Sequence, residues 1–245
     1  MTAIVLAAGK SRRMGQAVPK VLLEVLGRPL ISYVLAAARA AGANRLIAVV
    51  GPRCAAVPAA LSGQGVELAV QAEPRGTGDA LLACRSLLAD DEECVVLCGD
   101  APLVTEDSIS RLVAARAEQH ADLSVLTAEL ADAGSYGRVI RGQDGTVERV
   151  VECKDATEAE CRVKEVNSGF YAFSWGRIRP VLESLAPSPK TGEYYLTDVV
   201  QAVCRSGGRV VAVKARDYRE MLGANTPVEF DEVARVLTER GARGR

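Results

Sequence analysis

The sequence predicts an α/β protein built around a mostly parallel central sheet. In the first half, short apolar runs that suit strands buried on both faces alternate with longer stretches of helical periodicity. Such alternation is typical of βαβ units with right-handed crossovers. After residue 130 the pattern changes to a hairpin signal and a long β-type run. We therefore expect a mixed, strand-rich region that continues the same sheet.

The first half contains predicted strands separated by predicted helices. The strands cover residues 4–6, 45–50, 66–70, 93–97 and 123–127. The helices cover residues 30–41, 55–61, 77–88 and 106–118, and the last two are expected to begin at the N-caps Thr77 and Thr105. In a parallel sheet of this kind, ligands bind beyond the carboxyl ends of the strands.

The second half is expected to open with strands at 137–141 and 146–152, which flank the turn dipeptide Asp144-Gly145. A long strand follows at 163–173, then a helix at 175–185, a loop at 187–192, a helix at 198–204 and a strand at 209–213. Thr226 is expected to cap a final helix over 227–239, with Pro227 at its favoured first position, and the tail 241–245 to fray.

The composition is that of a globular protein with an ordinary balance of apolar and charged residues. Of 245 residues, 49% are hydrophobic and 25% are charged, and the net charge is −1. A chain so close to neutral has no overall field that would attract nucleic acid or a membrane, so neither is expected as a partner. We find no apolar run of membrane-spanning length and no leader-like start. The seven cysteines lack disulfide spacing, so we expect reduced thiols and a cytoplasmic location.

The first strand runs into a loop of small and cationic residues. Ala7, Ala8 and Gly9 leave the backbone open to close approach, and cations follow within eleven residues, at Lys10, Arg12, Arg13 and Lys20. Bare N–H groups beside fixed cations form an anion site, most naturally one for a polyphosphate. Ile4 stands where a Walker A loop needs glycine, and no glycine lies between Gly9 and Gly15 to make a dinucleotide fingerprint. A solvated basic loop remains the alternative on these residues alone.

Other polar residues also follow predicted strands, and each has a plainer interpretation. Asp100 comes directly after a buried strand and suits a Mg²⁺ ligand, or is a turn residue ahead of Pro102. Gln71 reads a base edge or merely ends a strand. Glu152 and Asn167 bind sugar hydroxyls or face solvent.

Two further features carry less weight alone. Gly76-Thr77-Gly78 is a tight turn that offers N–H groups to a ligand, or an ordinary helix start. Asn225 is by itself a turn residue. His120 is the single histidine, which removes histidine zinc sites and argues against a Ser-His-Asp device.

Together these segments carry a resemblance to a known family. Leu6-Ala-Ala-Gly9 with Arg13-Met14 and Pro19-Lys20 resembles the signature of sugar-phosphate nucleotidyltransferases. The further segments are Gln71-Ala-Glu-Pro-Arg-Gly-Thr-Gly78, Gly99-Asp-Ala-Pro-Leu103, Tyr136-Gly-Arg138, Val151-Glu-Cys-Lys-Asp-Ala156, Glu165-Val-Asn-Ser-Gly169, Gly192-Glu-Tyr-Tyr-Leu-Thr-Asp198 and Gly223-Ala-Asn225. In this order they look like the uridylyltransferase domain of the bacterial N-acetylglucosamine-1-phosphate uridylyltransferase family, over roughly residues 2–240.

The resemblance implies a Rossmann-like nucleotidyltransferase fold over residues 1–225. It has a nucleotide-binding half at about 1–130 and a sugar-binding half at about 131–225, followed by a C-terminal helix and tail at 226–245. It implies transfer of uridylyl from UTP to N-acetylglucosamine 1-phosphate with Mg²⁺ as cofactor. The catalytic residues would be Arg13, Lys20 and Asp100. The nucleotide-binding residues would be Leu6, Ala7, Ala8, Gly9, Lys20, Gln71, Gly76, Thr77, Cys98 and Gly99. The sugar-binding residues would be Gly137, Glu152, Asn167, Tyr195 and Thr197, and the metal ligands Asp100 and Asn225.

The chain departs from the family pattern at two positions beside the nucleotide site. Cys98 stands where members often carry tyrosine, and Asp79 where they often carry histidine. Another base or another sugar, such as glucose 1-phosphate, therefore stays open, as does a non-catalytic sugar-nucleotide sensor on the same fold. The bifunctional members continue into a β-helix acetyltransferase domain. This chain stops after the terminal helix, so we expect no acetyl transfer and leave the oligomeric state open.

Overall fold

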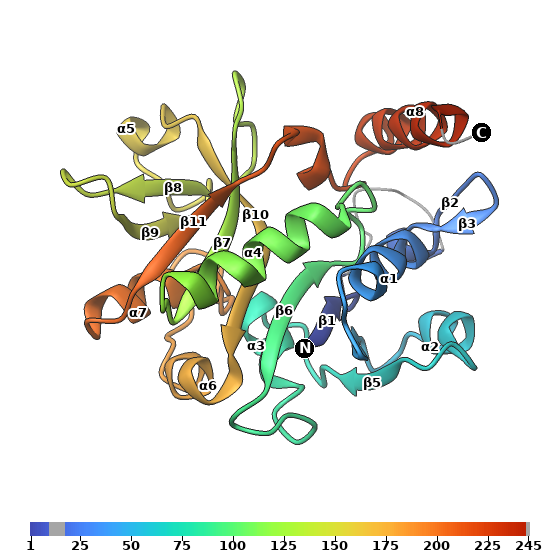
Figure 1. Ribbon diagram of the computed structural model, residues 1–245, viewed down its shortest axis with the longest axis horizontal. Coiled ribbons are helices and arrows are strands. Elements are labelled where there is room, and N and C mark those ends of the chain that lie inside the picture. The colour runs from blue at the N-terminus through green and yellow to red at the C-terminus, as the bar shows by residue number, and fades with distance from the viewer. Residues whose placement is uncertain (10–17, 244–245) are drawn as a thin grey trace.

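One large sheet organises the chain (Figure 1), which the computed structural model describes over residues 1–9 and 18–243. Its main path runs in the order β11-β7-β10-β6-β1-β4-β5. The strands on that path are β1 (Thr2–Leu6), β4 (Arg45–Val50), β5 (Glu67–Val70), β6 (Glu93–Cys98), β7 (Leu123–Glu129), β10 (Glu165–Ser174) and β11 (Val210–Lys214).

Most neighbouring strands on this path are parallel, as the sequence predicts. β1 pairs in parallel with β4 and β6, β4 with β5, and β7 with β11. β10 is antiparallel to both of its neighbours, β6 and β7. This long strand of the second half therefore lies inside the central sheet, between two strands of the first half. Such long-range pairing has no local signal in the sequence.

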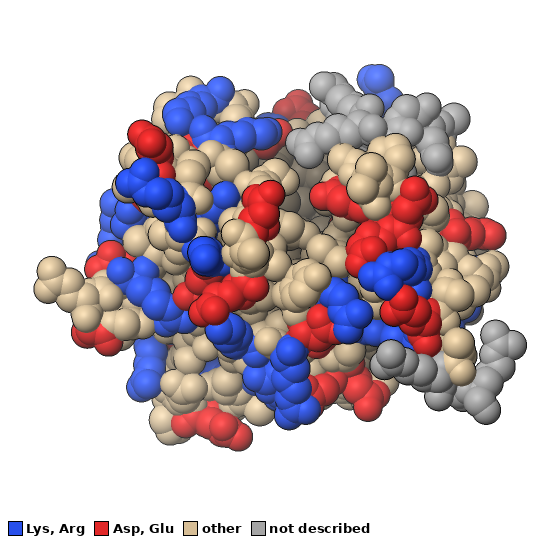
Figure 2. Space-filling model, turned by 90° about the horizontal axis from the view of Figure 1, so that it is seen from above, with Lys and Arg blue, Asp and Glu red and all other residues tan. Residues whose placement is uncertain are grey.

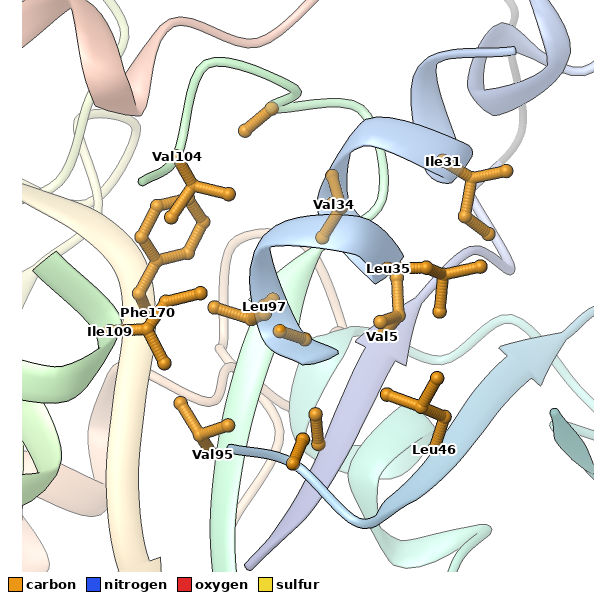
Figure 3. Packing of buried hydrophobic residues seen from close by; sticks show 14 of the residues in the cluster. Val5, Ile31, Val34, Leu35, Leu46, Val95, Leu97, Val104, Ile109 and Phe170 are labelled. Atoms are coloured by element: carbon orange, nitrogen blue, oxygen red, sulfur yellow. The ribbon is translucent and has the colours of Figure 1, made fainter. Parts of the chain in front are cut away.

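Helices cover both faces of the sheet. On one face, α1 (Leu30–Ala40), α2 (Ala56–Leu61) and α4 (Glu106–Glu118) share a core with the sheet. Figure 3 shows Val34 and Leu35 of α1 lying over Val5 and Leu97 of the strands. On the other face, α3 (Thr77–Leu82), α6 (Trp175–Glu183) and α7 (Asp198–Arg205) pack on the alternate strand residues. Burial on both faces explains the unbroken apolar runs of the strands.

A β-hairpin and the C-terminal helix complete the described fold. β8 (Arg138–Arg141) and β9 (Val147–Val151) pair antiparallel, and the predicted turn between them is present, with Gly145 at φ 82°. α8 (Pro227–Arg243) continues through residues 241–243, which we expected to be frayed. The reason is packing, because Val236 and Leu237 are buried and Arg240 donates to the Leu103 carbonyl at 2.7 Å.

Several local predictions need correction or addition. α3 ends at Leu82 instead of continuing to residue 88, and tighter i→i−3 turns follow it. The capped turn α5 (Glu158–Cys161) was not predicted, although Thr157 and Glu160 form a capping box. Also unpredicted are the 3-10 helices η2 (Lys20–Leu22) and η3 (Tyr218–Met221) and the short strands β2 (Glu24–Val25) and β3 (Arg28–Pro29). None of the described helices has the length and apolar character needed to cross a membrane.

Candidate functional site

The carboxyl ends of four parallel strands meet at one edge of the sheet, as the sequence predicts. Leu6 ends β1 and lies level with Cys98, which ends β6, and with Val49 of β4. Val70 ends β5 beside Val50. The segments that follow these strands therefore share one edge, and most of the predicted site residues lie on them. Figure 2 views the molecule from above and shows acidic and basic side chains interspersed over the described residues of that face.

The loop after β1 keeps the open backbone that its small residues predict. The Ala7 N–H donates to the Val49 carbonyl at 2.9 Å, which extends the sheet pairing past Leu6. Beyond Ala8, a Cβ on Gly9 would lie 3.7 Å from the Lys20 Cε, so the lysine side chain runs alongside this backbone. The predicted catalytic Arg13, with Lys10 and Arg12, lies outside the described residues.

Gly99 holds the ends of β1 and β6 together. Its N–H donates to the Leu6 carbonyl at 3.0 Å. A Cβ at this position would lie 3.0 Å from the Leu6 oxygen and 3.2 Å from the Val5 Cγ1, closer than side-chain carbons normally come. Glycine is therefore needed here for close approach, and it delivers the next residue, Asp100, to the edge of the sheet.

Three residues from distant parts of the chain converge at this edge. The Lys20 ammonium forms an ion pair with the Asp100 Oδ2 and donates to the Asn225 Oδ1 at 2.8 Å. The side chains of Lys20 and Asp100 are only 20% and 13% exposed, so little water screens the pair. The resemblance implied catalytic roles for Lys20 and Asp100 and metal-binding roles for Asp100 and Asn225, and the structure brings Lys20 into contact with the other two.

Asp100 and Asn225 fit a Mg²⁺ ion by the chemistry and placement of their oxygens. Both oxygens already converge on one cation, the Lys20 ammonium, and hard oxygens are the donors that Mg²⁺ prefers. Gly223 leaves room beside them, since a Cβ there would lie 3.1 Å from the Asn225 Nδ2 and 3.4 Å from the Asp100 Oδ2. Within residues 1–9 and 18–243, no three His, Cys, Asp or Glu side chains cluster as a metal site. Mg²⁺ commonly takes one or two carboxylates and completes its shell with substrate phosphates.

Asn225 is anchored by the start of α8. The Glu229 carboxylate accepts from the Asn225 backbone N–H at 3.0 Å and from the Thr226 hydroxyl at 3.2 Å. The Thr226 hydroxyl in turn caps the helix by accepting from the Glu229 N–H at 3.2 Å, as predicted for Thr226. Sequence reasoning did not assign Glu229 or Gly223 a part in the site. The spacing Thr226-x-x-Glu229 is a capping-box signal and was the available clue.

Gln71, Gly76 and Thr77 lie together in the loop after β5. Gln71 is buried, and its amide donates to the Gly76 carbonyl at 3.0 Å. Gly76 has φ 116°, and a Cβ on it would lie 2.4 Å from the Tyr194 carbonyl oxygen. Only glycine fits this position, because both the backbone conformation and the contact exclude a side chain.

The prediction that Thr77 caps α3 is wrong. Gly76 is the N-cap of α3, and the Thr77 hydroxyl accepts from the Leu196 N–H at 2.9 Å. Two more backbone hydrogen bonds, from Gly78 to Tyr194 and from Tyr194 to Arg75, join the same two segments. The loop after β5 is thus tied directly to the segment that carries the predicted sugar-binding residues Tyr195 and Thr197.

The predicted sugar-binding residues gather around the end of β9 and the start of α7. The buried Thr197 hydroxyl donates to the Glu152 carboxylate at 3.1 Å. The buried Tyr195 hydroxyl lies 2.6 Å from the Thr191 hydroxyl. Nearby, the Asn167 N–H donates to the Gly137 carbonyl at 2.9 Å, and the Asn167 side chain accepts from the Gly169 N–H at 3.1 Å. The structure therefore brings the five residues of this group to adjoining segments.

Burial sets the charge states of this region. It raises the pKa of Glu152 above its ordinary value, although the hydrogen bond from Thr197 opposes the shift. Burial likewise raises the pKa of Asp198, and the negative charge of Asp155 adds to the rise. Cys98, next to the bulge at Gly169 in β10, has its pKa raised to about 12 by burial and by the charge on Asp100. Cys98 is therefore a neutral thiol between the two groups of charged residues.

Comparison with known proteins places this architecture in a family. A model of the MobA-like NTP transferase domain matches residues 3–161. The bifunctional protein GlmU of Cupriavidus taiwanensis is 39% identical over 243 residues, which are 99% of this chain and 53% of that protein. The bifunctional protein GlmU of Streptomyces avermitilis is 41% identical over 242 residues, 97% of this chain and 50% of that protein. The chain thus spans about half the length of the curated relatives it matches.

A solved structure with the same fold is that of UDP-glucose pyrophosphorylase complexed with UDP-glucose. It superposes with a TM-score of 0.79 and covers 98% of both chains at 17% identity, which confirms the predicted Rossmann-like nucleotidyltransferase fold. The family match begins in β1 and runs past the hairpin, so it includes the strand ends after which Lys20, Gln71 and Asp100 lie, whereas Asn225 lies beyond the matched residues. The chain therefore belongs to the family of MobA-like NTP transferase domains.

Proposed function

We propose that this chain transfers a uridylyl group from UTP to N-acetylglucosamine 1-phosphate and releases pyrophosphate, in the cytoplasm. The observation that carries the proposal is the contact of Lys20 with Asp100 and Asn225 at the strand ends, across 80 and 205 residues of sequence. The similarity to bifunctional GlmU proteins over nearly the whole chain supports the choice of this reaction within the family.

The chemistry asks for positioning and charge stabilisation more than for proton transfer. A sugar phosphate is already an anionic nucleophile, so the reaction needs no general base. The barrier lies in bringing two anions together and in stabilising charge on the attacked phosphorus and the departing pyrophosphate. The Lys20 ammonium supplies a fixed positive charge there, and the bare backbone of Ala8 and Gly9 supplies room for the phosphates.

Asp100 and Asn225 would hold Mg²⁺ in this reaction. When bound, the ion supplies a second positive charge that neutralises phosphate oxygens. Lys20 at present satisfies both oxygens, so in the loaded enzyme it is expected to turn from them toward a phosphate. On the acceptor side, Glu152, Thr197 and Asn167 would hold the sugar by its hydroxyl and amide groups and so fix the line of attack.

A substrate panel tests the proposal. Pyrophosphate release is measured for UTP, CTP, ATP, GTP and dTTP, each combined with N-acetylglucosamine 1-phosphate, glucose 1-phosphate and glucosamine 1-phosphate, with and without Mg²⁺. We expect the highest kcat/KM for UTP with N-acetylglucosamine 1-phosphate, and loss of turnover when EDTA removes the metal. No turnover with this pair at millimolar Mg²⁺ would refute the proposal. A clear preference for glucose 1-phosphate would replace the acceptor and keep the reaction class.

A further inference from the structure

The Gln71 side-chain amide is held in one orientation by its partners. Its nitrogen donates to the Gly76 carbonyl at 3.0 Å and to the Asp79 Oδ2 at 2.9 Å. A carbonyl oxygen and a carboxylate oxygen can only accept, so the group that faces them must be the NH₂ and not the oxygen. Both amide hydrogens are therefore used within the protein, and the buried side chain has no freedom to exchange its two ends.

Asp79 is itself fixed by two different partners. The Arg75 guanidinium donates to its Oδ1 at 2.8 Å, while the Oδ2 accepts from Gln71. Arg75 also lies over the Tyr194 ring, with 5.7 Å between the guanidinium carbon and the ring centre. The carboxylate stands in the first turn of α3, where a negative charge is favoured. Each oxygen of Asp79 thus has its own donor, and the side chain cannot turn without losing one.

The consequence is that Gln71 offers only its carbonyl oxygen to a ligand. Among the described residues, no hydrogen bond is made to this oxygen. Some polar atoms of the described residues are fully enclosed and have no hydrogen-bond partner, but the Gln71 oxygen is not among them. Part of its surface is therefore open. Gln71 directly follows β5 at the edge of the sheet that carries Lys20 and Asp100. The position therefore presents a hydrogen-bond acceptor to whatever base is bound there.

We propose that Asp79 is a positioning residue that sets base specificity, because it turns the Gln71 carbonyl toward the base and so selects pyrimidines that carry an N–H at ring position 3. Uracil and thymine carry this donor, whereas cytosine has a lone pair there, so two acceptors would face each other. A buried acceptor left without a donor is costly to binding. This inference rests on the proposed function, since it assumes that a nucleotide base occupies the loop after β5.

Two substitutions separate this role from a merely structural one. Asp79→Ala and Arg75→Ala both remove the ion pair between the two residues, but only Asp79→Ala also removes one of the two acceptors that hold the Gln71 amide. Dissociation constants for UMP and CMP are measured by calorimetry, which needs no turnover. We expect the wild-type protein to favour UMP, Asp79→Ala to reduce that preference by about tenfold or more, and Arg75→Ala to keep it within about threefold.

Gln71→Leu provides a second variant in case Asp79→Ala does not fold. It removes the amide, so the preference for UMP should disappear, and adding Asp79→Ala to it should change nothing more. The inference is overturned if the wild-type protein binds UMP and CMP equally, if Asp79→Ala weakens both by the same factor, or if Gln71→Leu keeps the preference. If the preference depends on Asp79 but the substrate panel shows no uridylyl transfer, the inference stands and the proposed reaction fails.

Discussion

Lys20 bridges two oxygens from opposite parts of the chain. Its ammonium forms an ion pair with Asp100 and donates to the side-chain oxygen of Asn225. An ammonium on a flexible stem suits this double use, since it acts as a point charge without a fixed direction.

Asp100→Ala should abolish Mg²⁺-dependent turnover and leave the fold intact. The change removes a ligand oxygen at a loop, while the Asp100 backbone carbonyl still accepts from the Ala224 N–H. Steady-state kinetics at saturating Mg²⁺ measure the effect, and Asp107→Ala, which changes a half-buried acid on α4, is the matched control. A rate within about tenfold of wild type, roughly 1.4 kcal/mol, would show that the role assigned to Asp100 is wrong.

Lys20→Ala examines the same centre from the cationic side, and near-normal kcat/KM would reject its role.

Glu152→Gln should stabilise the protein near neutral pH and not in acid. Burial raises the pKa of Glu152 in the folded state above its ordinary value of 4.5, so the folded protein binds the proton more tightly than the unfolded chain. Below pH 4.5 the carboxyl is protonated in both states and costs no stability. As the pH rises from 4.5 through the higher pKa of the folded state, the free energy of unfolding falls. The glutamine keeps an acceptor for Thr197 without a charge.

Urea unfolding of the two proteins at about pH 4 and about pH 7.5 measures this difference. Glu148→Gln, a change of an exposed carboxylate on β9, serves as the control and should show no such trend. A Glu152→Gln variant that is less stable than wild type at the higher pH would contradict the assignment. Under the proposed function, the same variant should raise KM for the sugar phosphate by about tenfold, because it would weaken a charge-assisted hydrogen bond from the acceptor.

At the scale of elements, the loop after β5 and the segment before α7 behave as one unit. Backbone hydrogen bonds and the Thr77 hydroxyl join residues 75–78 to residues 194–196, and Gly76 packs against Tyr194 with no room to spare. The first segment carries the base candidates and the second carries acceptor candidates. A disturbance of either segment should therefore reach both substrates.

Gly76→Ala should destabilise the protein and weaken binding on both sides of the site. The new Cβ would meet the Tyr194 oxygen at 2.4 Å, in a backbone conformation at φ 116° that alanine avoids. We expect a loss of about 1–3 kcal/mol in urea unfolding, with KM raised for both substrates. Gly63→Ala is the matched control, because Gly63 has φ 74° but open space around it, so only about 1 kcal/mol should be lost. Equal losses in the two variants would show that the contact with Tyr194 carries no strain.

The sequence predicts elements well where their signals are local, and less well where distant segments decide. Thr105 and Asp144-Gly145 mark a helix start and a turn by their own chemistry, and both predictions are confirmed. The predicted length of α3 was wrong, and so was the prediction that Thr77 caps it. The Thr77 hydroxyl instead accepts a hydrogen bond from the N–H of a distant residue, Leu196. For the site, strand ends predicted that Gln71 and Asp100 share an edge. The resemblance implied only a metal-binding role for Asn225, and its contact with Lys20, across 205 residues of sequence, was not predicted.

For the whole molecule, the position of β10 ties the two halves into one sheet. Among the strands that the structure describes, β7 pairs only with β10 and β11, and both of these come from the second half (Figure 1). The first half therefore supplies β7 without any strand to hold it. The two halves also share a core, because Phe170 and Tyr171 of β10 pack into the clusters on the two faces of the sheet.

A fragment of residues 1–130 should fail to fold cooperatively. It would leave β7 without partners and would expose the edge of β6 and the apolar residues that β10 covers. Circular dichroism during urea unfolding and binding of a hydrophobic dye compare the fragment with the full chain. For the fragment we expect a broad unfolding transition that depends only weakly on urea concentration, together with strong dye binding. A sharp transition with little dye binding would show that the first half is an independent folding unit.

The reach of the contact between Lys20 and Asn225 has a consequence for biosynthesis. Synthesis makes Lys20 about two hundred residues before Asn225 and the helix start that anchors it. The contact between these two side chains can therefore form only after all the residues between them have been made. A chain interrupted before Asn225 would keep the ion pair of Lys20 with Asp100 but would lack the amide oxygen that completes this arrangement.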